Sequence, residues 1–433
     1  MVADGKIVEL VPTGKTPAAD IDTVFDASRL VLLPGLINTH HHFYQTLTRA
    51  FSRSLNKGLF PWLSTLYPVW ANLRPDDISI SSKLAMVELM LSGCTTTVDH
   101  HYVFSSSLTE AIDIQIQEAR NLGIRVVLTR GSMSLGKSQG GLPPNCIVQD
   151  DQTILDDSAR LIKSYHCRNE GAMTQIALAP CSPFSVTSEL MRATADLSTM
   201  EGVRLHTHLA ETIDEQKYCQ SYFGMSPLEY LGHVGWLSDR TWLAHGVHFN
   251  ENEIMVLGKE RVGVSHCASA NMVLASGICP AVGLENAGCP LGLGVDGSAS
   301  NDSSNLIQEI RLAFLLQRLK YGADKVSHLD ALRWATNGAA ACIGRSDIGV
   351  IAVGMQADLA LFSLDEPRFS GFEDPIAALI LCGAHKADHV MVKGRWIVAK
   401  GEAIGIDVPE LLRKHSESAS QLRQLYDNVP SYA

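Results

Sequence analysis

Short apolar runs alternate with amphipathic segments over the middle of the chain, between about residues 35 and 300. The runs are rich in β-branched and aliphatic residues, which is typical of buried strands. They read GLINTH, TTTVDH, RVVLTRG, TQIALAP, VRLHTHLA, TWLAHGV, VGVSHC and PLGLGVDG. The segments between them, such as SSKLAMVELMLSG and EIRLAFLLQRL, have the character of helices. Eight strand–helix units predict an α/β fold, a (β/α)8 TIM barrel over residues 34–345.

The two ends of the chain have a different pattern. Residues 1–33 and 346–405 alternate apolar and polar positions between glycines, as in GKIVELVP, TVFDASRLVLLP and HVMVKGRWIVAKGEA. This alternation predicts short antiparallel strands, which we expect to form one small β-sandwich domain built from both chain ends. Residues 406–433 are predicted to form a C-terminal helical segment, with its helix over roughly 408–428. The Gly/Pro-rich loop 131–145 is predicted to be a flap beside the barrel mouth.

Composition narrows the class of partner. Hydrophobic residues make up 46% and charged residues 19% of the chain, which excludes a disordered or fibrous protein. The net charge of −11 disfavours nucleic acid and anionic membranes and favours a small-molecule substrate. The ten cysteines form no CxxC pair, and the first residues do not resemble a signal peptide, so we expect a cytoplasmic protein with reduced thiols. A homo-oligomer is compatible with a barrel of this size.

Three consecutive histidines end the first predicted strand. Side chains alternate between the two faces of a strand, so His40 and His42 point the same way and can share one metal ion. His41 points to the other face. Because barrel enzymes carry their active sites after the C-terminal ends of the strands, this is the place where a metal site is expected.

The fifth run adds His206, His208 and Glu211. With His208 facing the metal, Glu211 lies at the rim of the barrel, where an acid or base belongs. His206 has the same parity as His208 but lies deeper, so we interpret it as interior packing or as support for a ligand.

The remaining strand ends complete a metal site. The sixth run ends in His245, the seventh in His266, and the eighth provides Asp296 as a carboxylate ligand. Three imidazoles and one carboxylate suit zinc or iron and leave a position for water, whose pKa falls to about 7 on such an ion. The fourth run ends in Cys181 and contains no lysine to carry a bridging carbamate, which favours a single ion and disfavours a cyclic-amide hydrolase.

The motifs PGLINTHHH, HLAE, LAHG, SHC, GVDGS and VGMQADLALF resemble the amidohydrolase superfamily, and specifically its mononuclear aminohydrolase branch. The resemblance covers essentially the whole chain. It implies one divalent metal ion, Zn²⁺ or Fe²⁺. It also implies that the metal ligands are His40, His42, His208 and Asp296. Glu211 and His245 would then surround the reacting centre.

Further motifs narrow the substrate. HHHFYQTLTR, FPWLSTLYPVW, DHHY, LAPCSPFSVT and GVDGSASND resemble the members of this branch that convert 8-oxoguanine to urate. That resemblance implies that Gln45 and Cys181 contact the purine, with Tyr102 as a further candidate. Guanine, isocytosine, a pterin, an s-triazine or an adenosyl nucleoside remain alternative substrates, and a non-catalytic scaffold on the same fold is the alternative from another class.

The expected reaction is attack of an activated water on the amine-bearing carbon C2. Asp296 is expected to take the proton of this water and return it to the leaving ammonia, while His245 orients the nucleophile. Glu211 is expected to protonate the adjacent ring nitrogen.

Two departures from the family pattern stand out. The family usually has HCPxSN after the seventh strand, whereas this chain has HCASAN at residues 266–271, so we expect a different loop there. The family also has about one further strand before the segment that begins here at Val2. We therefore expect an incomplete N-terminal part of the β-domain.

Overall fold

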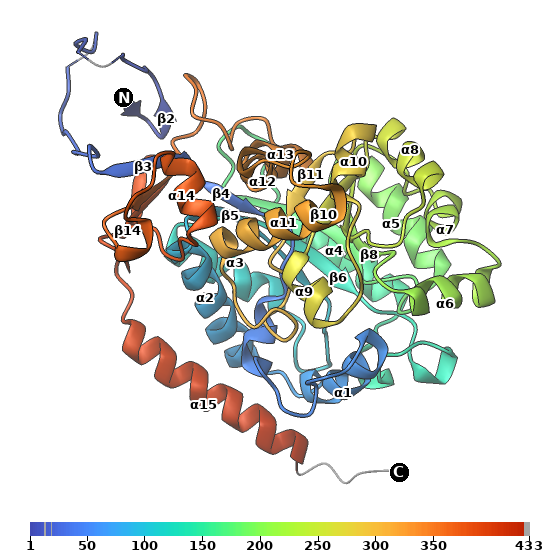
Figure 1. Cartoon of the computed structure of the whole chain (residues 1–433). Helices are drawn as coiled ribbons and strands as arrows, with labels where there is room; N and C mark the ends of the chain where they lie inside the picture. The colour runs from blue at the N-terminus through green and yellow to red at the C-terminus, as the bar shows by residue number, and fades with distance from the viewer. Residues whose placement is uncertain (13, 19, 428–433) are drawn as a thin grey trace.

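Eight parallel strands close into a barrel at the centre of the computed structural model (Figure 1), which describes all residues except 13, 19 and 428–433. Their order around the barrel is β10-β11-β4-β5-β6-β7-β8-β9. The strands are β4 (Leu36–Asn38), β5 (Cys94–His101), β6 (Arg125–Ser132), β7 (Thr174–Pro180), β8 (Leu205–Leu209), β9 (Thr241–His245), β10 (Gly263–His266) and β11 (Leu291–Leu293). Each predicted run overlaps one of these strands, so the predicted TIM barrel is confirmed.

The barrel closes where β11 meets β4. These strands have one paired position, Leu293 with Asn38. Beyond it, the backbone N–H of Val295 donates to Asn38 Oδ1 at 2.9 Å, and the N–H of Asp296 donates to the carbonyl of His40 at 3.1 Å. The seam therefore holds two predicted ligands, His40 and Asp296, side by side.

Helices surround the barrel and begin where the sequence provides capping residues. Asp150, Thr187 and Asn250 each accept a hydrogen bond from the backbone three residues on, at the starts of α4, α5 and α8. The helices of the barrel are α1 (Leu59–Trp70), α2 (Pro75–Leu91), α3 (Ala111–Leu122), α4 (Asp151–Tyr165), α5 (Ser188–Glu201), α6 (Ile213–Phe223), α7 (Pro227–His233), α8 (Glu251–Lys259), α9 (Ala268–Val273), α10 (Ala281–Ala287), α11 (Leu306–Tyr321), α12 (His328–Trp334) and α13 (Asn337–Cys342).

A second sheet joins the two ends of the chain. Its antiparallel order is β15-β14-β13-β12-β3, formed by β3 (Leu30–Pro34), β12 (Leu359–Ser363), β13 (His389–Val392), β14 (Arg395–Ala399) and β15 (Glu402–Ala403). The helix α14 (Pro375–Leu381) lies between β12 and β13 in the chain, and β1 (Val2–Ala3) and β2 (Lys6–Ile7) form a separate two-stranded sheet. The predicted domain boundaries stay a prediction.

The strand predicted over TVFDASRLVLLP is shorter than expected and begins only at Leu30. Val24 is highly exposed, and Phe25 is only partly covered, by the rings of His389 and Trp396 at centroid distances of 4.8 and 4.9 Å. The Asp26 carboxylate accepts a hydrogen bond from the backbone N–H of Ser28 at 2.9 Å, which holds a local turn in place of an extended strand.

A buried ion pair joins the second sheet to the barrel. Arg125, the first residue of β6, donates from Nε and Nη2 to the two carboxylate oxygens of Asp358 at 3.0 and 3.1 Å. Asp358 also accepts from the backbone N–H of Lys393 at 2.8 Å. Both side chains of the pair are almost fully buried, so this contact is shielded from solvent.

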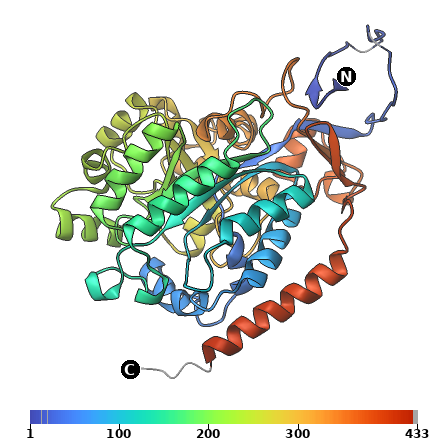
Figure 2. The ribbon, with the colours of Figure 1, turned by 180° about the vertical axis from the view of Figure 1, so that it is seen from behind.

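The long helix α15 (Val408–Asp427) leaves the second sheet and lies along α2, as the front and rear views show (Figure 1 and Figure 2). His415 lies within hydrogen-bond distance of Thr46, with 3.0 Å between Nε2 and Oγ1, which links α15 to η1 (Phe43–Thr48). The predicted helix is present as far as Asp427, and the rest of the predicted C-terminal segment, 428–433, lies outside the described residues.

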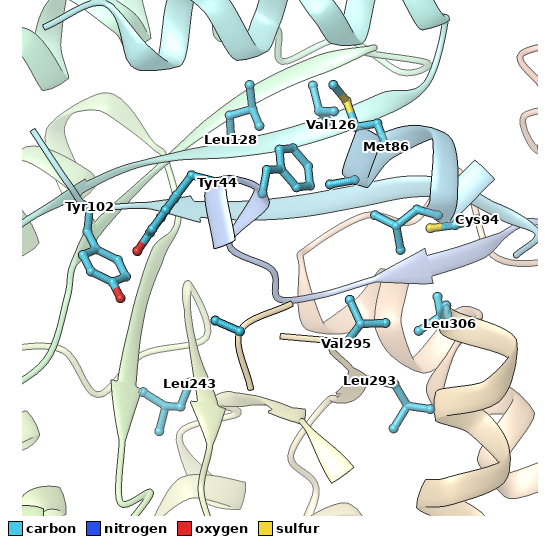
Figure 3. Packing of buried hydrophobic residues seen from close by; sticks show 14 of the residues in the cluster. Tyr44, Met86, Cys94, Tyr102, Val126, Leu128, Leu243, Leu293, Val295 and Leu306 are labelled. Atoms are coloured by element: carbon cyan, nitrogen blue, oxygen red, sulfur yellow. The ribbon is translucent and has the colours of Figure 1, made fainter. Parts of the chain in front are cut away.

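One large apolar cluster fills the space between the strands and the helices, and part of it is shown in Figure 3. Val126 and Leu128 of β6 and Met86 of α2 belong to it, together with Tyr44 and Tyr102 near the barrel mouth. In the part of the chain that the structure describes, we find no helix with the length and apolar character needed to cross a membrane.

Candidate metal-dependent active site

The predicted ligands gather at the C-terminal ends of the barrel strands. His40 and His42 follow β4, His208 lies in β8, and Asp296 follows β11. Asp296 and His245 have positive φ angles of 61° and 74°, which non-glycine residues rarely adopt. Such local strain is common where a fold must aim a functional side chain.

Two of the histidines present the same ring nitrogen to the site. His42 donates from Nδ1 to the carbonyl of His100 at 2.6 Å, and His208 donates from Nδ1 to the carbonyl of Cys181 at 2.7 Å. A carbonyl can only accept, so Nδ1 carries the hydrogen in both rings. Burial lowers the pKa of both rings and keeps them neutral, so each offers the lone pair of Nε2.

His40 is oriented through a second histidine. The Nδ1 atom of His206 donates to the carbonyl of Trp242 at 2.9 Å, so Nδ1 carries the hydrogen of this ring. Its Nε2 atom therefore accepts a hydrogen bond from Nδ1 of His40 at 2.8 Å. Burial lowers the pKa of His206 to about 3, which keeps this ring neutral. The Nε2 atom of His40 is buried and has no hydrogen-bond partner among the described residues, so it is a third free lone pair. The interpretation of His206 as support for a ligand fits this geometry.

The spacing of the free atoms suits a divalent ion. His42 Nε2 lies 3.1 Å from His208 Nε2, and the Nε2 atoms of His40 and His42 each lie 3.3 Å from Asp296 Oδ1. Ligands of a tetrahedral zinc ion, at bond lengths of about 2.0–2.1 Å, lie about 3.3 Å from one another. Lone pairs and a carboxylate at these distances repel one another unless a cation lies between them, so the donor set fits a metal ion.

Two acid–base candidates stand next to the ligands. His245 Nε2 lies 3.5 Å from Glu211 Oε2 and 4.0 Å from Asp296 Oδ2. Burial raises the pKa of the Glu211 carboxyl, and the nearby charge of Asp296 raises it further, against the opposing effect of His245. Burial lowers the pKa of His245, but the charges of Glu211 and Asp296 outweigh this and raise it overall.

Further side chains hold these two groups in place. Asn271 Oδ1 lies 2.9 Å from His245 Nδ1, and Ser276 donates to Glu211 Oε1 at 3.3 Å. The buried Glu215 carboxylate accepts from the backbone N–H groups of Ala210 and Glu211 at 3.0 and 2.9 Å. Asn271 therefore holds the His245 ring in place, even though the loop after β10 departs from the family pattern.

A cavity with about 410 Å³ of space not filled by atoms opens beside the ligands. Gln45, Cys181 and Tyr102, the predicted substrate-binding residues, all line it, as do His42, His208, Glu211, His245 and Asp296. Burial raises the pKa of Cys181 to about 12, so its S–H is available as a donor at neutral pH.

Part of the cavity wall comes from α1. Trp62 and Tyr67 of this helix line the cavity, whereas the loop 131–145, predicted to be a flap, contributes no residue to it. That loop instead packs on the segment after β7, with two N–H groups donating to the carbonyl of Ser185. The Tyr67 hydroxyl and Gln45 Oε1 are buried and have no hydrogen-bond partner in the described part of the chain, so both are free to bind a polar ligand.

Sequence reasoning missed the contribution of His100. This residue ends β5, stacks on His208 with ring centroids 4.7 Å apart, and positions His42 through its carbonyl. The doublet His100-His101 at a strand end was the available signal, because only the first of the two points toward the barrel interior. His41 and His266 lie elsewhere, against Ser304 and Gln317.

The barrel, the cluster of histidines and Asp296 at its C-terminal end, and the neighbouring Glu211 and His245 form the arrangement expected of a metal-dependent hydrolase. A model of the amidohydrolase family matches residues 31–397, and the chain belongs to this family.

Relatives within the family are similar over the full length. The chain is 59% identical to the 8-oxoguanine deaminase of Pseudomonas aeruginosa over 422 residues, which are 98% of this chain and 94% of that protein. It is 32% identical to an isoxanthopterin deaminase from an unknown prokaryotic organism, over 90% of this chain and 85% of that protein. Among solved structures, it resembles the zinc complex of atrazine chlorohydrolase TrzN from Arthrobacter aurescens, with a TM-score of 0.92, 32% identity and coverage of 97% and 94%.

Proposed function

We propose that this protein catalyses the hydrolytic deamination of 8-oxoguanine, in which water and 8-oxoguanine give urate and ammonia. The observation that carries this proposal is the 59% identity to an 8-oxoguanine deaminase across 98% of the chain. The cavity supports it, because Gln45, Cys181 and Tyr102 lie together beside the histidine cluster.

We propose zinc as the resident ion, held by His40, His42, His208 and Asp296. The ligand spacing described above suits zinc, and ferrous iron takes the same ligand types. When bound, such an ion supplies a Lewis acid that lowers the pKa of water and so provides a nucleophile near neutral pH.

The protein's own groups then handle the protons. Asp296, through Oδ2, takes a proton from the attacking water and later returns it to the leaving amine. His245 lies 4.0 Å from this oxygen and orients the water through Nε2. Glu211 delivers its proton to the ring nitrogen beside C2, so negative charge does not accumulate on the ring as the new C–O bond forms. It takes a proton back from the new hydroxyl when the C2 carbonyl forms and ammonia leaves.

Directional hydrogen bonds hold the flat ring in the cavity. The Gln45 amide and the Cys181 thiol meet the edge of the purine, while Tyr102 and the α1 aromatics enclose its faces. A site that hydrogen-bonds a ring discriminates between isomers more strongly than apolar contact does, because the wrong isomer leaves buried polar groups unpaired.

We also place the enzyme in the cytoplasm, since all ten cysteines are free thiols.

Ammonia release and urate absorbance test this function in the purified zinc-loaded protein. The panel consists of 8-oxoguanine, guanine, isocytosine, isoxanthopterin and S-adenosylhomocysteine. We expect the highest kcat/KM with 8-oxoguanine, loss of activity after dialysis against a chelator, and recovery on adding zinc. Preference for another substrate would refute the assignment of 8-oxoguanine, and full activity in the metal-free protein would refute the metal-dependent mechanism.

A further inference from the structure

A second cavity lies at the opposite end of the barrel from the candidate active site. It is lined by residues at the starts of β7, β8 and β9 and by the end of α13, and it has about 810 Å³ of space not filled by atoms, open to solvent. Three arginines line it, Arg168, Arg204 and Arg240, together with His166. No carboxylate lines it among the described residues, which is notable in a chain with a net charge of −11.

The hydrogen bonds of these arginines are mostly to neutral groups. Arg204 donates from Nη2 to the carbonyls of Asp239 and Cys342 at 2.8 and 3.1 Å, and Arg240 donates to the Thr199 hydroxyl at 2.8 Å. Hydrogen bonds to neutral acceptors leave the positive charge of both guanidinium groups uncompensated.

Two donors of this cluster are buried without an acceptor. The Nε atoms of Arg204 and Arg240 have no hydrogen-bond partner in the part of the chain that the structure describes. Burial lowers the pKa of Arg204, and the charge of Arg240 lowers it further, while Cys342 and Asp239 act in the opposite direction. A buried, unpaired donor that carries charge is costly, so this cluster is suited to an anion.

Only one carboxylate forms an ion pair with these arginines in the described chain. Glu201 lies 3.7 Å from Arg168, and both side chains are largely exposed at the rim. Arg204 and Arg240 have no such partner.

The backbone keeps room for the cluster. Gly344 has φ +72°, and a Cβ there would fall within 2.9 Å of three atoms of the Arg204 side chain. At Gly202 an added Cβ would meet nothing within 4 Å, so this side of the cavity is open space. The guanidinium of Arg204 therefore packs against Gly344, where a larger residue would collide with it. The space beside Gly202 is open, so a ligand can reach the cavity from that side.

We propose that this cavity is a binding site for a phosphate group, recognised by Arg168, Arg204 and Arg240. Arginine forks match phosphate oxygens with paired, charge-assisted hydrogen bonds, and a dianion compensates more than one guanidinium at once. The phosphate is either free or carried by a nucleoside monophosphate, whose base would rest on the apolar part of the lining formed by Ile176 and Ile343. This site is separate from the proposed deaminase site and does not depend on that function.

Isothermal titration calorimetry on the zinc-loaded protein tests the proposal, with inorganic phosphate and guanosine 5′-monophosphate as separate probes at constant ionic strength. The comparison is between the wild-type protein, Arg168→Gln/Arg240→Gln, and the control Arg29→Gln. Arg29 lies outside the cavity and is highly exposed, so its substitution removes charge without touching the site. Any binding of phosphate at the metal site is expected to have the same affinity in all three proteins, so it does not affect the comparison.

We expect saturable binding whose Kd rises about tenfold or more for each arginine lost, and which Arg29→Gln leaves unchanged. Tighter binding of the nucleotide than of phosphate identifies a nucleoside monophosphate as the ligand, and equal binding identifies free phosphate. Absence of saturable binding in the wild-type protein, or equal binding in the double variant, overturns the proposal. Arg240→Gln alone serves as the variant if the double variant does not fold.

Discussion

Replacing Gly297 with alanine is expected to act on a single neighbour, Gln45. Gly297 follows Asp296 in the loop after β11, and an added Cβ would lie within 3.0 Å of three side-chain atoms of Gln45, namely Oε1, Cδ and Nε2. Gly297 does not have a positive φ, so alanine causes no backbone strain there. The Gln45 side chain is almost fully buried and must move to make room.

The size of the effect follows from two contributions. Forcing an extra methyl group into a packed site costs about 1–3 kcal/mol of stability. Moving the Gln45 amide away from the substrate removes about one hydrogen bond, about 0.5–1.5 kcal/mol, which lowers kcat/KM by about 2- to 13-fold. Zinc content is expected to stay the same.

A double-mutant cycle provides the assay. The four proteins are wild type, Gly297→Ala, Gln45→Ala and the combination, each measured by urea unfolding and by ammonia release from 8-oxoguanine. In the Gln45→Ala background the obstruction is gone, so Gly297→Ala is expected to cost close to nothing in either measurement. An equal cost of Gly297→Ala in both backgrounds would show that the methyl group acts elsewhere and would refute the reasoning.

Three other substitutions test the acid–base group, the buried ion pair and the response to acid. Glu211→Gln is expected to lower kcat for ammonia release by about 10²- to 10⁴-fold, with zinc content by atomic absorption unchanged; normal turnover would contradict its role. Asp358→Asn leaves the buried guanidinium of Arg125 unpaired, so urea unfolding should show a loss of about 3–5 kcal/mol, whereas a loss near that of exposed pairs, under about 1 kcal/mol, would count against it. Burial raises the pKa of Asp347, but hydrogen bonds from Arg345 outweigh this and lower it from 3.8 to about 2. The folded pKa lies below the unfolded one, so about 2 kcal/mol of stability is present above about pH 5 and is lost as the pH falls toward 2. Acid unfolding of Asp347→Asn should lack this loss, and identical pH profiles of the two proteins would disprove the linkage.

The barrel was predictable because its strands are buried on both faces and separated by amphipathic helices. Continuous apolar runs such as TQIALAP have few other stable arrangements when helical segments lie between them. The strand expected before Leu30 was wrong for a reason that alternation alone does not reveal. Val24 is exposed and Phe25 contacts the rings of His389 and Trp396, but the turn held by Asp26 and Ser28 keeps this segment out of the sheet.

The candidate site was predictable where residue spacing alone places side chains. Parity along a strand put His40 and His42 on one face, and strand ends brought His208, His245 and Asp296 to the same rim. The tautomers were not predictable, because they depend on carbonyls contributed by neighbouring strands. The cavity wall was only partly predictable, since the approach of α1 in place of the loop 131–145 depends on tertiary packing.

Closure of the barrel at the seam between β4 and β11 sets the time at which a metal ion could be acquired by the proposed ligands. His40 lies near the beginning of the chain, and its neighbour across the seam, Asp296, comes only after more than half of the chain has followed. During synthesis a ribosome must therefore deliver almost the whole barrel before these two ligands can meet. An ion that binds all four ligands binds only the closed form, so its binding free energy adds to the stability of the finished fold. Metal uptake at these ligands would then report that the barrel has closed at this seam.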